Sequence, residues 1–137
     1  MKKYHFVFDK GKENQKIKKI LLNKFKNFNP NISNIIVVLG GDGFMLDTLK
    51  KFQKYNKPFY GINTGAFGFL MNKYNNQNLE KIISKTKLIS ISPLQMKVLT
   101  IYGKTFSAIA VNEISLLRQS RQTASLQITN KNKILIK

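Results

Sequence analysis

The sequence lacks cysteine and has no long apolar run, and each absence excludes a class of protein. With no Cys among 137 residues, disulfide bonds and thiolate metal sites are excluded. The longest apolar run, Ile35 to Leu39, has the length of a strand, whereas a membrane-spanning helix needs ~18 or more apolar residues. Asp9 precedes any long apolar region, so the amino terminus is unlike a secretory signal. We expect a cytoplasmic protein that spans no membrane.

Acidic residues and arginine are also scarce. Six Asp and Glu stand against 24 Lys and Arg, which gives a net charge of +18, and 22 of the basic residues are lysine. Recognition of base edges and phosphates relies mostly on the planar fork of arginine. A joint excess of Lys, Asn and Ile is instead typical of codon usage in an AT-rich genome. Specific nucleic-acid binding is therefore not favoured, and a polyanionic small ligand remains open.

The first part of the chain has the pattern of an open α/β fold. The apolar fraction of 42%, with 10 Phe and 5 Tyr, argues for a folded core. Short apolar runs predict strands, and apolar residues on one helical face predict helices between them. The predicted strands are Tyr4–Phe8, Asn34–Leu39 and Pro58–Ile62, and the predicted helices are Glu13–Phe28, Phe44–Tyr55 and a segment capped by Asn78 that runs to Lys85. We expect a Rossmann-like parallel sheet with flanking helices over residues 1–90.

The pattern changes after residue 90. Apolar and polar residues now alternate, which predicts strands. The predicted strands are Leu88–Ile91, Gln95–Tyr102, Thr105–Leu117, Ser125–Thr129 and Lys133–Lys137. Residues 91–137 would thus begin a β-rich domain that is too short to close a core of its own. We therefore expect the chain to be a fragment of a longer protein.

Residues 40–43, Gly-Gly-Asp-Gly, form the sharpest local motif and follow the most apolar predicted strand. Glycines let the backbone approach a phosphate closely, and the start of the next helix offers an anion site. Gly40, Gly41 and Gly43 are therefore candidate phosphate-binding residues. Asp42 would repel phosphates, and a general base that takes a proton from an attacking hydroxyl is one reason for a carboxylate there. An ordinary Asp-Gly turn remains the alternative.

Two further motifs follow. Residues 63–70, Asn-Thr-Gly-Ala-Phe-Gly-Phe-Leu, form a second glycine loop at the end of a predicted strand, so it should lie near the first loop. Asn112 and Glu113 interrupt an apolar run, and such a pair would be costly if buried without partners. A ribose diol suits the carboxylate of Glu113. An exposed edge position explains the pair equally well.

Taken in order, the motifs at 40–43, 63–70 and 112–118 (Asn-Glu-Ile-Ser-Leu-Leu-Arg) resemble the NAD kinase family. The resemblance covers essentially this whole chain but only about the first half of a family member. Members continue into a β-rich domain with a further Gly- and Thr-rich motif, which does not occur before Lys137. A smaller departure is Phe44, where many members carry Thr.

The resemblance implies transfer of the γ-phosphoryl group of ATP to the 2′-hydroxyl of the adenosine ribose of NAD, which gives NADP. Asp42 would be the general base and, with Gly43, Asn112 and Glu113, would contact NAD. A divalent ion, Mg²⁺, would accompany ATP and be held by its phosphates more than by the protein. The resemblance also implies a homo-oligomer. The alternatives are a related diacylglycerol-type lipid kinase with the same glycine motif, or a non-catalytic fragment that binds nucleotide or RNA.

Overall fold

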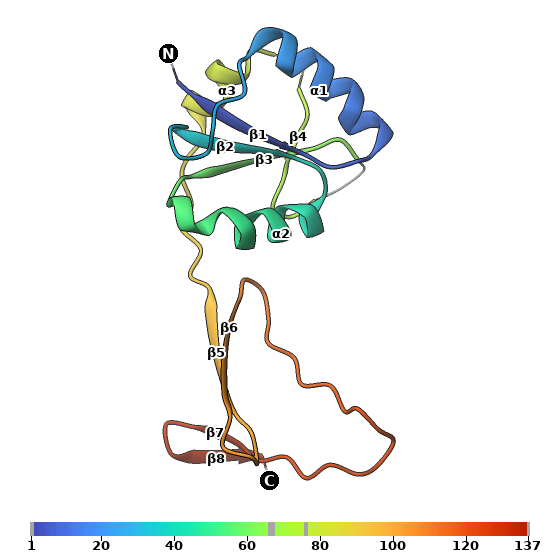
Figure 1. Cartoon of the computed structure of the whole chain (residues 1–137), viewed down its shortest axis with the longest axis vertical. Coiled ribbons are helices and arrows are strands. Elements are labelled where there is room, and N and C mark those ends of the chain that lie inside the picture. The colour runs from blue at the N-terminus through green and yellow to red at the C-terminus, as the bar shows by residue number, and fades with distance from the viewer. Residues whose placement is uncertain (1, 66–67, 76, 137) are drawn as a thin grey trace. The chain divides into compact units, whose positions relative to one another are not determined.

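The computed structural model describes residues 2–65, 68–75 and 77–136 (Figure 1). The chain divides into two compact units, residues 1–90 and residues 91–137. The first unit contains a parallel sheet with helices, as expected for an α/β fold. None of the helices in the described residues is long and apolar enough to cross a membrane.

The sheet of the first unit has four parallel strands in the order β1-β2-β3-β4. The strands are β1 (Tyr4–Phe8), β2 (Ile35–Leu39), β3 (Phe59–Asn63) and the two-residue β4 (Asn72–Lys73). The three strands predicted from apolar runs are confirmed to within one residue at either end. The fourth is too short for any period-two pattern and was not predicted.

Helices cover both faces of this sheet (Figure 1). The elements are α1 (Lys12–Lys24), α2 (Asp42–Phe52), a 3-10 turn (Gln53–Tyr55) and α3 (Leu79–Lys85). Asn78 caps α3 as predicted, because its side chain accepts hydrogen bonds from the backbone N–H groups of Glu80 and Lys81 at 2.9 and 3.4 Å. Its amide thereby satisfies two donors that the first turn of a helix leaves without partners.

Strand β2 divides the core into two layers. Val37 and Leu39 face the cluster that contains α1 and α3, whereas Ile36 and Val38 face the cluster that contains α2. All four side chains have an exposed fraction of 0%. The alternation of side chains along a strand therefore places α1 and α2 on opposite faces of one sheet.

The placement of α1 and α2 on opposite faces determines the handedness of the two strand–helix–strand connections. The connections β1–α1–β2 and β2–α2–β3 both move one strand in the same direction across the sheet. They pass over opposite faces, so they have opposite hands. Since about 98% of such connections are right-handed, one of the two is of the rare left-handed kind.

The predicted helix boundaries need two corrections. Helix α1 ends at Lys24 and not at Phe28, because Asn27 and Phe28 form hydrogen bonds with β1 and so leave the helical path. Helix α2 begins at Asp42 and not at Phe44, which places the acidic residue in its first turn. For α1, hydrogen bonds outside the apolar pattern fix the boundary. For α2, the N–H of Met45 donates to the carbonyl of Gly41 at 3.0 Å and starts the helix before Phe44.

The second unit consists of two antiparallel hairpins. They are β5 (Leu94–Leu99) with β6 (Thr105–Ala110), and β7 (Ile128–Asn130) with β8 (Lys133–Ile136). The predicted strand Thr105–Leu117 ends at Ala110, Ser125–Thr129 is strand only from Ile128, and Leu88–Ile91 forms no strand. No residue of 91–136 is buried, so the second β domain is not confirmed as a packed structure.

We expect Tyr4 to make stability sensitive to alkaline pH. Tyr4 is 1% exposed, and its hydroxyl has no hydrogen-bond partner among the described residues. Burial, with a smaller contribution from Glu80, raises the pKa of Tyr4 above its ordinary value of 10.0. The unfolded chain therefore loses this proton first, and stability falls as the pH rises above about 10.

The test is Tyr4→Phe, measured by urea unfolding. At neutral pH the variant should cost less than ~1 kcal/mol, because the lost hydroxyl had no partner. Above about pH 10 its free energy of unfolding should fall less steeply than that of the parent. Tyr102→Phe, at a residue that is 83% exposed, should leave the slope unchanged. Equal slopes for the parent and Tyr4→Phe would contradict the prediction.

Candidate functional site

The first glycine motif forms the turn from β2 into α2. Gly41 is the N-cap of α2 and has extended backbone, with φ −98° and ψ 179°. Asp42 and Gly43 form the start of the helix, where backbone N–H groups lack intrahelical acceptors and the helix dipole favours negative charge. The turn therefore presents both a carboxylate and N–H donors at the carboxyl edge of the sheet.

Gly40 is required by packing inside the protein. A Cβ atom at this position would lie 2.7 Å from Cδ1 of Phe44 and 3.1 Å from Cβ of Asp9. The N–H of Gly40 already donates to the carbonyl of Ile62 at 3.1 Å. Phe44 thus packs directly against Gly40. These contacts give Gly40 a structural role and engage its N–H within the sheet.

Gly41 and Gly43 differ from Gly40 in their surroundings. Apart from the chain neighbours and the backbone of the helix itself, no described atom lies within 4 Å of a Cβ built at either position, and both residues are exposed. Packing within the described chain therefore does not require glycine at these two positions. An unobstructed backbone beside helical N–H groups is what close approach of a phosphate needs.

The carboxylate of Asp42 joins the two glycine loops. Its Oδ2 accepts a hydrogen bond from the N–H of Phe69 at 2.8 Å, and its Oδ1 accepts one from the N–H of Leu70 at 3.1 Å. The expectation that the second loop lies near the first is thereby confirmed. Two backbone donors hold the carboxylate in one orientation at the edge of the sheet.

The second loop has further internal hydrogen bonds. Asn63, at the end of β3, accepts from the N–H of Gly65 through Oδ1 at 2.8 Å. Thr64 donates its hydroxyl to the side chain of Asn14, a buried residue of α1, at 2.6 Å. Ala66 and Phe67 of the predicted motif lie outside the described residues. The bonds of Asn63 and Thr64 were not predicted, because asparagine and threonine are common in ordinary loops.

Asn112 and Glu113 belong to the second unit. Both are exposed and follow β6, which ends at Ala110. The predicted strand Thr105–Leu117 therefore ends before the pair, and no burial cost applies to it. Glu113 lines a shallow depression of about 180 Å³ together with residues of both strands of the hairpin, including Met96 and Ala108. The loop that carries Asp42 is in the first unit, and the pair is in the second.

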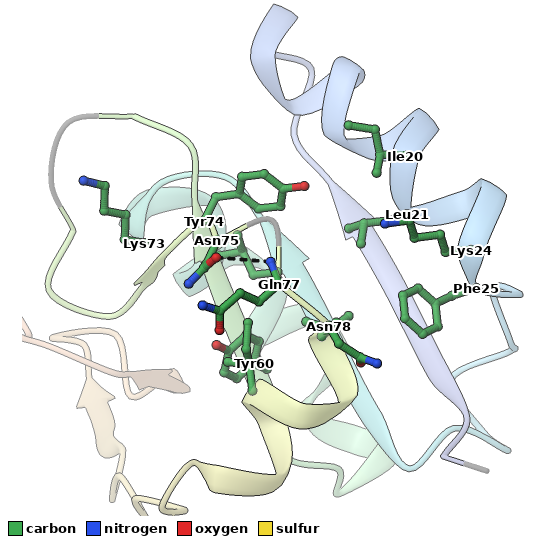
Figure 2. A pocket seen from close by; sticks show the side chains of 13 residues that line it. Ile20, Leu21, Lys24, Phe25, Tyr60, Lys73, Tyr74, Asn75, Gln77 and Asn78 are labelled. Carbon is green, nitrogen blue, oxygen red and sulfur yellow. Dashed lines mark hydrogen bonds between the residues drawn. The ribbon is translucent and has the colours of Figure 1, made fainter.

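A cavity of the first unit is separate from Asp42. It has a volume of about 210 Å³ and lies over the face of the sheet that α1 and α3 cover (Figure 2). Its lining includes apolar side chains such as Leu21 and Phe25, and Tyr60, whose pKa is raised by burial. None of the glycine-motif residues lines it. The cavity is thus a gap above the core and not part of the candidate site.

No protein-built metal site is evident in residues 2–65, 68–75 and 77–136. This part of the chain has no group of three or more His, Cys, Asp or Glu that could hold a metal ion. The carboxylate of Asp42 is the acidic group at the turn, and each of its oxygens already accepts one N–H. A cation at this edge would need ligands from elsewhere, such as the phosphates of a nucleotide.

Comparison with known proteins decides the family. A sequence model described as the ATP-NAD kinase N-terminal domain matches residues 2–87. The chain belongs to the NAD kinase family. It is 39% identical over 123 residues to a NAD kinase of Rhizobium meliloti, an alignment that covers 90% of this chain and 48% of that protein. It is 40% identical over 130 residues to a NAD kinase of Brucella suis, with coverage of 95% and 51%.

The match is closer over a shorter segment of another relative. A NAD kinase of Mesorhizobium japonicum is 45% identical over 95 residues, which cover 69% of this chain and 37% of that protein. The chain spans about half the length of the curated relatives it matches. The match of 2–87 includes both glycine loops, so the geometry described for Asp42 lies inside the family's amino-terminal domain.

We predict that Gly40 and Gly43 respond oppositely to alanine. Gly40→Ala forces a Cβ against Phe44 and should lower the free energy of unfolding by about 1–3 kcal/mol. Gly43→Ala meets no described atom within 4 Å outside its chain neighbours and its own helix backbone, and should be neutral or stabilising by up to about 1 kcal/mol, since alanine favours the helix. Urea unfolding of both variants measures this. A Gly40→Ala protein as stable as the parent would contradict the packing argument.

Proposed function

We propose that the chain serves the transfer of the γ-phosphoryl group of ATP to the 2′-hydroxyl of the adenosine ribose of NAD. The observation that carries this proposal is the position of Asp42. Its carboxylate is held at the carboxyl edge of the sheet by two N–H groups, between two glycines whose backbone is open. Membership of the NAD kinase family supports the choice of substrates.

In the proposed reaction Asp42 acts as the general base. The ribose 2′-hydroxyl oxygen forms a bond to the γ-phosphorus while its proton passes to the Asp42 carboxylate. The bond between the γ-phosphorus and the bridging oxygen breaks, and ADP leaves with that electron pair. A carboxylate accepts about four hydrogen bonds, and two are occupied. Acceptor capacity therefore remains for the hydroxyl.

The remaining residues would bind the substrates. We propose that Gly41 and Gly43 let phosphates reach the N–H groups at the start of α2, while Gly40 supports the turn by packing against Phe44 and Asp9. Asn112 and Glu113, both exposed on the second unit, would hold NAD. A divalent ion would neutralise the charge of ATP and take its ligands mainly from the phosphates. The net charge of +18 attracts such polyanions.

The first test is Asp42→Asn, measured as NADP formed from NAD and ATP with Mg²⁺. Loss of a general base should lower kcat by roughly 10²- to 10⁴-fold. Asp47→Asn is the matched control, because Asp47 is an exposed carboxylate on the same helix. Near-parental kcat in Asp42→Asn would rule out the proton-accepting role. Phosphorylation of diacylglycerol vesicles but not of NAD would identify a lipid kinase.

The second test addresses Glu113 by calorimetric titration with NAD. Glu113→Ala should weaken NAD affinity by roughly tenfold or more, because a hydrogen bond to a charged carboxylate is lost. Glu13→Ala removes an equal charge from an exposed position on α1 and should leave the affinity unchanged. Equal affinity in the parent and Glu113→Ala would remove Glu113 from the proposed NAD site.

A further inference from the structure

Hydrogen bonds to one side chain attach residues 68–70 to the edge of the sheet that carries Asp42. Each oxygen of the Asp42 carboxylate accepts one N–H of this segment, from Phe69 at 2.8 Å and from Leu70 at 3.1 Å. Beyond these bonds, Leu70 and Met71 pack against the apolar cluster on the α2 side of the sheet. The segment is thus held by Asp42 through the N–H groups of Phe69 and Leu70, and by the core through the side chain of Leu70.

A side chain at Gly68 would crowd this attachment. A Cβ atom on Gly68 would lie 2.9 Å from Oδ1 of Asp42 and 3.1 Å from Nδ2 of Asn63. The Asn63 side chain is itself engaged with the N–H of Gly65. A methyl group at position 68 would therefore push against the carboxylate or against the loop. Glycine is needed here for space, next to the atoms that hold the loop.

We propose that Asp42 has a second role as the anchor of residues 68–70, and that Gly68 is a positioning residue for its carboxylate. The anchor stands on the hydrogen bonds alone, whereas its importance for turnover rests on the proposed function. One lone pair of each oxygen is used by the loop, and the other stays available to a substrate hydroxyl. The same two hydrogen bonds then fix both the orientation of the proposed base and the position of the second loop.

This dual role changes what a substitution of Asp42 means. Asparagine keeps one oxygen acceptor but places an amide NH₂ where the second oxygen accepted an N–H. Asp42→Asn therefore releases part of the loop as well as removing the base. A loss of activity in that variant does not by itself separate the two roles, so the anchor needs a measurement that is independent of turnover.

Amide hydrogen exchange on the 137-residue chain, followed by NMR, supplies that measurement. In the parent, the amides of Phe69 and Leu70 should be protected, and Asp42→Asn should accelerate their exchange on the order of tenfold to a hundredfold. The amide of Gly65, which donates to Asn63 at 2.8 Å, is the internal control and should keep its rate. Asp47→Asn should change none of the three.

Two outcomes of the exchange experiment overturn the anchor. One is that Phe69 and Leu70 exchange freely in the parent, and the other is that Asp42→Asn leaves their rates unchanged. Faster exchange at Phe69 and Leu70 in Asp42→Asn, together with no NADP formation by the parent chain, would instead support the anchor and count against the proposed function. The two proposals therefore fail separately.

A double-mutant cycle tests Gly68 and does not depend on exchange rates. Gly68→Ala should lower the folded-to-unfolded equilibrium constant by on the order of tenfold in the parent. In an Asp42→Ala background the carboxylate is gone, so the same substitution should have a clearly smaller effect. Additive effects would show that Gly68 does not act through Asp42. Gly68→Ala in the parent also keeps the proposal testable if Asp42→Asn unfolds, since its expected loss of stability needs no substitution of Asp42.

Discussion

From Ile36 to Leu39, strand β2 is completely buried on both faces, and its pairing on both edges determines where the candidate site can form. Parallel hydrogen bonding to β1 on one side and to β3 on the other aligns the ends of three strands. The N–H of Asp9 donates to Leu39, and the N–H of Gly40 donates to Ile62, so the ladder continues to the last residue of the sheet. The glycine turn starts from a fixed point because the strand that precedes it has no freedom to shift register.

The sequence allowed the elements of the first unit to be predicted, because the apolar period is strong there. Run length and β-branching indicated β2, and one-sided apolar spacing indicated α1 and α2. Boundaries were less predictable. Phe25 fits the helical spacing of α1 but adopts extended backbone, and its ring packs edge-on against Tyr4 at 5.7 Å. Contacts that are distant in sequence decide such an end, and one sequence does not reveal them.

The location of the candidate site could be predicted from the sequence, but its hydrogen bonds could not. The position of Asp42 after an apolar strand indicated a site at the carboxyl edge. Its partners are the backbone N–H groups of Phe69 and Leu70. The identity of a residue does not show where its backbone N–H donates, so these partners could not be predicted. Gly68 was the one available signal, because a second glycine in a short loop indicates close approach of some other atom. The second unit was the least predictable, because alternating residues there form hairpins without a buried face.

Contacts within the first unit explain two of the four residues of the glycine motif and do not explain the other two. Phe44 and Asp9 leave no room for a side chain at Gly40, and the second loop occupies both oxygens of Asp42. These two positions are explained by contacts inside the first unit. Gly41 and Gly43 are not, since their Cβ directions are open and both lie beside unsatisfied helical N–H groups. Gly41 and Gly43, which contacts inside the chain do not explain, are thus the two residues that face outward. A phosphate would meet backbone N–H donors there, and Gly40 and Asp42 hold that backbone in place.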